Sequence, residues 1–126
     1  MSDLLNLETI VLTELREGVR AREVVGERMT FTVIELAANA TVPEHRHEHE
    51  QIGMVIAGRV RFRLDDETRD LGPGGIWRIL ANHPHEVTAG PDGAVVVEVF
   101  SPVRTDWDDR ERTAPRAPVW PPAASG

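Results

Sequence analysis

The 126-residue sequence contains no cysteine, no lysine and no tyrosine. Without cysteine it has no disulfide framework, no thiolate nucleophile and no cysteine-ligated metal cluster. All 14 basic residues are arginine. Because Schiff-base catalysis and phosphate binding by a P-loop both need a lysine, these two classes of enzyme are excluded.

Basic residues are also scarce relative to acidic ones, and the formal net charge is −7. A nucleic-acid partner is excluded on this ground, because binding phosphates requires a basic surface. The sequence has no run of ~18 apolar residues that would span a membrane. It also begins without the basic and apolar segments of a signal peptide. We therefore expect a cytoplasmic protein with no membrane partner.

Short segments rich in β-branched residues, separated by glycine, proline, asparagine or aspartate, predict an all-β sandwich or barrel. The chain length suits a single domain with one core. Residues 90–93 are typical of a turn. At least eight strands are expected, with segments at residues 8–12, 19–25, 29–36, 51–57, 60–64, 75–80, 86–89 and 94–100.

The composition changes after residue 104, since five of the nine prolines lie at or beyond Pro102. We expect a β-barrel domain over residues 1–104 and a proline-rich C-terminal tail over residues 105–126. Disordered segments contain few aromatic residues. Trp107 and Trp120 are therefore expected to hold the tail against the barrel or a partner subunit.

Residues 29–36 are apolar on both faces of the expected strand. One small barrel interior can bury only one of these faces. An apolar outer face that stays exposed is typical of an interface between subunits, so the sequence predicts a homodimer.

All five histidines lie between residues 45 and 85, and His45, His47 and His49 occupy alternate positions. Residues two apart project from the same face of an extended chain. His45 and His47 can therefore bind one metal ion through neutral imidazole nitrogens. The alternative is a solvated loop in which the histidines have no common role.

The sequence around these histidines resembles the cupin superfamily, and in particular its small single-domain members. The first cupin motif is matched at the family spacing by Asn39, His45, His47, Gln51 and Gly58. The second motif is matched more loosely, by Pro73, Gly74, Gly75 and His85. Asn39 stands where glycine is usual, and Gln51 stands where glutamate is usual. The resemblance covers about residues 15–104.

The resemblance implies a jelly-roll β-barrel that binds one metal ion through His45, His47, Gln51 and His85. Three imidazoles and a carbonyl oxygen suit a divalent Zn, Ni, Fe or Mn ion. A neutral Gln51 leaves the full charge of the ion uncompensated, which favours Lewis-acid chemistry over redox chemistry. Binding by His49 in place of Gln51 is an alternative, whereas His83 is expected to be a turn residue.

Glu98 is the only charged residue in the apolar segment 95–100. If it is buried, it is paired or has a raised pKa, and either condition suits a proton-transfer group. The alternative is a glutamate that faces outward at the edge of the sheet.

The segment from Glu98 to Arg104 also resembles a stretch of the cupins that ketonise 4,5-unsaturated uronates. The resemblance implies catalytic roles for Glu98 and Arg104 and contact of Phe100 with the substrate, although Glu98 replaces an aspartate of that group. Trp77 is a further candidate for the wall of a substrate pocket, with packing in the core or an interface as the alternative.

These features predict a Lewis-acid isomerase or lyase that acts on a small carboxylate or sugar acid. Three alternatives remain at this point: a metal-dependent dioxygenase, a polyketide cyclase, and a small-molecule-binding cupin without catalytic activity. Fold alone does not choose among them.

Overall fold

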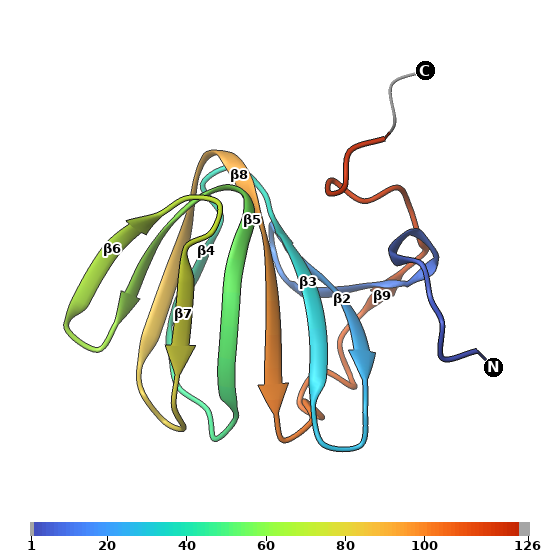
Figure 1. Ribbon diagram of the computed structural model, residues 1–126, viewed down its shortest axis with the longest axis horizontal. Coiled ribbons are helices and arrows are strands. Elements are labelled where there is room, and N and C mark those ends of the chain that lie inside the picture. Colours follow the sequence, from blue (N-terminus) through green and yellow to red (C-terminus); the bar gives the residue numbers. More distant parts are fainter. Residues whose placement is uncertain (1, 124–126) are drawn as a thin grey trace.

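The computed structural model describes residues 2–123 and shows an all-β architecture. Within this range there is one short 3₁₀ helix and no α-helix, and so no helix long and apolar enough to cross a membrane. The strands pair antiparallel in the order β6-β5-β8-β3-β2-β1-β9, with β4 joined to β8 and β7 joined to β5 (Figure 1). The elements are η1 (Leu7–Thr9), β1 (Leu12–Arg16), β2 (Val19–Val25), β3 (Thr30–Leu36), β4 (Thr41–His45), β5 (Glu50–Leu64), β6 (Glu67–Leu71), β7 (Ile76–Ile79), β8 (His85–Ser101) and β9 (Arg112–Thr113).

Two long neighbouring strands, β5 and β8, fold this sheet into a barrel. The second part of β8, residues 94–101, pairs with β3 and with the first part of β5. The first part of β8, residues 85–89, pairs with β4 and with the second part of β5. The β5–β8 pair therefore passes from one layer of the barrel to the other, as strands do at the corners of such barrels.

The corner is formed by register shifts in β5 and by two glycines in the left-handed region. The register shifts between Val55 and Ala57 and again between Gly58 and Val60. Gly58 has φ +75° and Gly93 has φ +77°. A Cβ atom on Gly58 would lie 2.2 Å from the carbonyl oxygen of Gly93. No other residue fits at position 58, because both the conformation and the close approach require glycine.

The predicted all-β fold is confirmed, and the limits of several strands differ from the expectation. Residues 51–57 and 60–64 form one strand, and residues 86–89 and 94–100 form another that includes the expected turn. The turn residues bend β8 at the barrel corner without reversing the chain. Residues 7–9 are helical and the first strand begins at Leu12, so the segment 8–12 is not a strand.

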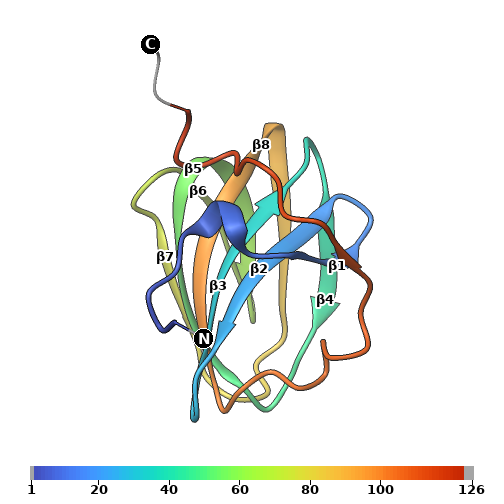
Figure 2. The same cartoon turned by 90° about the vertical axis from the view of Figure 1, so that its right-hand side faces the viewer.

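The later part of the tail packs against the outside of the barrel, as Figure 2 shows for the segment that passes in front of β2 and β3, whereas Trp107 near its start belongs to the core. Trp107 is buried beside Phe100, and β9 pairs with β1. Glu35 on β3 accepts hydrogen bonds from Arg22, Arg116 and the backbone N–H of Val119, at 2.7, 2.7 and 3.0 Å. The division into two segments at residue 104 stays a prediction.

Glu35→Gln is expected to destabilise the protein by about 3 kcal/mol at neutral pH, because Arg22 is fully buried and would lose its ionic partner. Burial by itself raises the pKa of Glu35, but the hydrogen bonds from Val119, Arg22 and Arg116 outweigh it and the net pKa is lowered. The ionised Glu35 therefore stabilises the folded protein fully above pH 4.5, the ordinary pKa of its carboxyl group. The stabilisation is lost as the pH falls through the lowered pKa that Glu35 has in the folded protein. Urea unfolding at several pH values measures both effects.

Glu67→Gln is the matched control, because Glu67 pairs with Arg69 on an exposed surface where both side chains are about two-thirds accessible. It should change the free energy of unfolding by less than about 0.5 kcal/mol. Equal effects of the two substitutions would contradict the role given to Glu35.

The outer face of the sheet carries a row of apolar side chains that the tail does not cover. Phe31, Val99 and Ile52 are cross-strand neighbours on β3, β8 and β5, with exposed fractions of 43%, 36% and 49%. We propose that this row forms the interface of the homodimer expected from the sequence. Light scattering should give twice the 14.0 kDa mass of the chain, and the mass of a single chain at micromolar concentration would contradict the proposal.

Candidate metal site

Three histidines from β4, β8 and the loop between β4 and β5 meet inside the barrel. His45 ends β4, His85 begins β8, and these two residues are direct partners in the sheet. His47 lies in the loop that follows β4. The potential ligand atoms of the three side chains all lie within 4.8 Å of one another. The predicted clustering of His45, His47 and His85 is therefore present.

Each of these imidazoles is held by a backbone carbonyl two residues away. The Nδ1 atoms of His45, His47 and His85 lie 2.9, 3.0 and 2.9 Å from the carbonyl oxygens of Pro43, His49 and His83 respectively. Since a carbonyl only accepts, each Nδ1 carries a proton, and Nε2 is the nitrogen through which each ring could bind a metal in its neutral form. Such fixing of the tautomer is typical of histidines that bind metals.

The Nε2 atoms of His47 and His85 are buried and have no hydrogen-bond partner in the part of the chain that the structure describes. Burial lowers the pKa of both residues to about 4, and for His47 the charge of Arg104 adds to this effect. The two rings are therefore neutral at pH 7, as metal ligands must be. Unpartnered buried lone pairs on neutral imidazoles fit a divalent transition metal.

Gln51, the expected fourth ligand, lies at the start of β5 and lines the same cavity. Its Nε2 donates to the Glu98 carboxylate, and its buried Oε1 has no partner among the described residues. A carbonyl oxygen is thus free to act as a ligand.

The three-histidine group does not include the other two histidines among the described residues. His49 is buried and binds Nδ1 of His47 through its backbone carbonyl. The exposed ring of His83 lies 2.9 Å from Asp65. His83 therefore adjoins the group through its backbone, whereas His49 also places its ring against that of His47, with centroids 5.4 Å apart.

Glu98 points into the barrel, and only 8% of it is exposed. Its Oε2 accepts hydrogen bonds from Trp77 Nε1, at 2.9 Å, and from Gln51. Burial raises the pKa of Glu98 to about 7, although the Trp77 hydrogen bond and the charge of Arg104 oppose the shift. The alternative of an outward-facing glutamate is therefore wrong.

Trp77 is only 5% exposed. Its ring stacks on Phe62 in the core, with centroids 4.6 Å apart, and it also lines the cavity.

Arg104 packs against two aromatic rings beside this cluster. Its guanidinium carbon is 4.6 Å from the centroid of Phe100 and 4.4 Å from that of Trp107. Its Nε and Nη2 atoms donate to Asp106 at 2.8 and 2.6 Å. The hydrogen bonds from Arg104 lower the pKa of Asp106.

Sequence reasoning missed Asp106 and the contact of Trp107 with the site. Two features of the sequence could have indicated them. Asp106 follows the candidate Arg104 by two residues, and Trp107 is an aromatic residue in a proline-rich tail.

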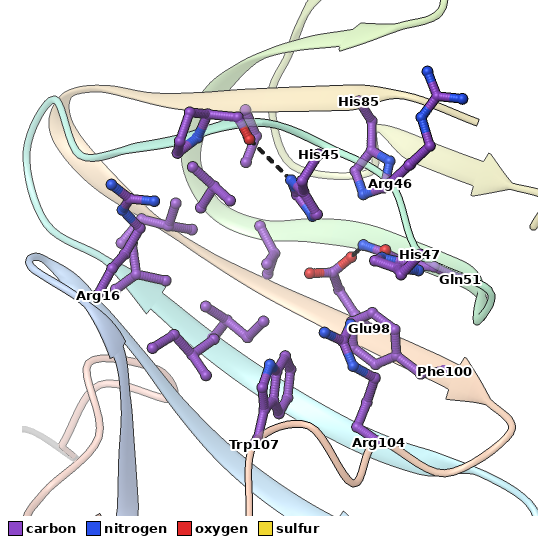
Figure 3. Close-up of a pocket in the computed structure, with 18 of the residues that line it drawn as sticks. Arg16, His45, Arg46, His47, Gln51, His85, Glu98, Phe100, Arg104 and Trp107 are labelled. Atoms are coloured by element: carbon purple, nitrogen blue, oxygen red, sulfur yellow. Dashed lines mark hydrogen bonds between the residues drawn. The ribbon is translucent and has the colours of Figure 1, made fainter. Parts of the chain in front are cut away.

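A cavity of about 340 Å³ contains these groups, a volume in the range of small-molecule sites. Figure 3 shows the histidines, Gln51 and Glu98 on one side of it, with Arg16 on the opposite side. Arg16, Arg46 and Arg110 also line the cavity, and none of them pairs with a carboxylate among the described residues. Arg110 donates to the carbonyl oxygen of Leu15, and in an acidic chain these cations without a carboxylate partner favour the approach of an anionic ligand.

Comparison with known proteins identifies the family and the fold. A family model described as a cupin domain matches residues 32–100. The pectin degradation protein KdgF of Dickeya dadantii is 28% identical over 96 residues, which are 75% of this chain and 87% of that protein. The structure of KdgF from Halomonas sp. has a TM-score of 0.71 at 26% identity, covering 75% of this chain and 90% of the other. An RmlC-like cupin from Shewanella frigidimarina has a TM-score of 0.78 at 20% identity, covering 84% and 96%.

Proposed function

The chain belongs to the cupin domain family, and from this premise we propose that it is a metal-dependent isomerase or lyase that acts on a small carboxylate or sugar acid. One observation carries the proposal: a single cavity holds three clustered imidazoles, two of them with buried and unpartnered Nε2 atoms, and a buried carboxylate. The similarity to a pectin degradation protein adds support, since that relative matches three-quarters of the chain.

His45, His47 and His85 would hold one divalent Zn, Ni, Fe or Mn ion through Nε2, and Gln51 would hold it through Oε1. All four ligands are neutral, so none of them offsets the charge of the ion. When bound, such an ion supplies Lewis acidity towards an oxygen atom of the substrate.

The remaining groups bind the substrate and move a proton. Arg104 presents a cation to a substrate carboxylate, while the rings of Phe100 and Trp107 pack against its guanidinium. Glu98 lies beside the imidazoles and carries a proton from one substrate atom to another. In a 4,5-unsaturated uronate the ring C–O bond breaks, the anomeric hydroxyl loses a proton and C4 gains one. This isomerisation needs no oxidant.

Incubation of the purified protein with a 4,5-unsaturated uronate tests the proposal. We expect the ultraviolet absorbance of the double bond to disappear without uptake of oxygen. A chelator should stop the reaction, and added divalent metal should restore it. Oxygen consumption would contradict the proposal and favour a dioxygenase, whereas the absence of any reaction would contradict the substrate class.

A further inference from the structure

Trp77, Gly53 and Glu98 form one row across three neighbouring strands. Gly53 on β5 is the direct partner of Trp77 on β7 and of Glu98 on β8. The side chain of Trp77 reaches across β5, over Gly53, and donates from Nε1 to the Glu98 carboxylate at 2.9 Å. The hydrogen bond therefore connects two strands that are not themselves paired.

The missing side chain of Gly53 makes this contact possible. A Cβ atom at Gly53 would lie 2.5 Å from Trp77 Nε1, 2.6 Å from Cε2 and 2.8 Å from Cζ2. The backbone of Gly53 is not among the positive-φ glycines. The backbone conformation of Gly53 therefore does not require glycine. Glycine is required because the indole of Trp77 occupies the space that a side chain at this position would take.

The row fixes the orientation of the Glu98 carboxylate. Trp77 and Gln51 both donate to the same oxygen, Oε2. The other oxygen, Oε1, accepts no hydrogen bond from any residue that the structure describes. Trp77 is itself fixed by stacking on Phe62. Rotation of the carboxylate would break both hydrogen bonds, so one oxygen is held and the other is left for the cavity.

We propose that Gly53 and Trp77 are positioning residues, which hold Oε2 of Glu98 so that Oε1 faces the substrate. The same bonds direct the amide of Gln51, since its Nε2 is bound to Glu98 and its Oε1 remains free. The consequence for turnover rests on the proposed function, whereas the arrangement of the three side chains does not.

A ¹⁵N–¹H correlation spectrum of the metal-loaded protein tests the arrangement directly. The chain has three tryptophans, and Trp77→Phe identifies the indole N–H signal of Trp77 by its loss. Glu98→Asp shortens the side chain by one methylene and should shift that signal. Gly53→Ala should shift it too, because the added methyl group displaces the indole. An unchanged Trp77 signal in either variant would overturn the inference.

Gly90→Ala is the matched control for the glycine substitution. Gly90 lies on β8 outside the positive-φ region, and the nearest atom to its added Cβ would be 3.5 Å away, an ordinary contact. This variant should leave the Trp77 signal and turnover as in the parent protein. A shift of the Trp77 signal in Gly90→Ala as large as in Gly53→Ala would overturn the assignment to Gly53.

Kinetics separate positioning from packing. Trp77→Phe should keep the fold while kcat falls roughly 10- to 100-fold and KM changes less than about threefold, because the acid is misplaced and substrate binding is not. The double variant with Gly53→Ala should stay as slow as Trp77→Phe, because the indole N–H that donates to Glu98 is already absent.

A folded Trp77→Phe variant with the parent kcat would overturn the positioning role. Failure of the parent protein to convert any unsaturated uronate would instead refute the proposed function. In that case the indole signal of Trp77 alone decides the inference.

Discussion

Replacing His47 with alanine will abolish stoichiometric binding of a divalent metal ion. His47 supplies one of only three imidazoles whose ligand atoms lie within 4.8 Å of one another among the described residues. Loss of a residue that only hydrogen-bonds to a metal ligand already lowers metal affinity about 10- to 100-fold. Loss of a ligand itself should therefore lower the affinity by more than about 100-fold. Elemental analysis after dialysis should find about one ion per chain in the parent protein and almost none in the variant.

His83→Ala is the matched control for this experiment. Its ring is exposed and lies against Asp65, and only its backbone carbonyl touches the site, through Nδ1 of His85. The substitution keeps that carbonyl, so metal content should not change. Full occupancy in His47→Ala would show that the three imidazoles do not form the metal site.

The parts of the site that sequence predicted are those fixed by local spacing. His45 and His47 share a face because they are two residues apart, and the family motifs identify His85 and Gln51. The carbonyls that hold the three imidazoles carry no sequence signal, because every residue has one. Their role appears only when the end of β4, the loop after it and the loop before β8 are in place.

The fold shows the same distinction between local and long-range information. Residues 19–25 form the expected strand because their pattern is local. Gly58 and Gly93 are typical of strand ends, yet here they bend strands that continue through the corner. Their close approach depends on pairing between β5 and β8 across more than thirty residues.

The direction of Glu98 could not be decided from sequence, because its neighbours on both sides are valines. The register with β5 places it on the inner face, opposite Gly53. Arg104 was identified by resemblance. Its partners Asp106 and Trp107 lie in the segment between β8 and β9, whose path the strand pattern does not describe.

Glu98→Gln should leave the metal content and the fold unchanged and reduce turnover of a 4,5-unsaturated uronate by about 10²- to 10⁴-fold. Glutamine has nearly the same shape as glutamate and keeps an oxygen that can accept from Trp77, but it cannot carry a proton between substrate atoms. A general acid or base typically contributes a factor of this size. The decrease in ultraviolet absorbance measures kcat, and circular dichroism with elemental analysis checks the fold and the metal.

The metal content of this variant decides between two roles of the same carboxylate. Glu98 also binds the amide of Gln51, so a purely structural Glu98 would act by directing Gln51 towards the ion. In that case Glu98→Gln would lower metal affinity, and saturating metal would restore turnover. If Glu98 carries the proton, the variant stays slow with a full complement of metal, because the ion is bound as before and only the titrating group is gone. Parent-like turnover at full occupancy would contradict both roles and would leave a metal-binding cupin whose buried carboxylate takes no part in the chemistry.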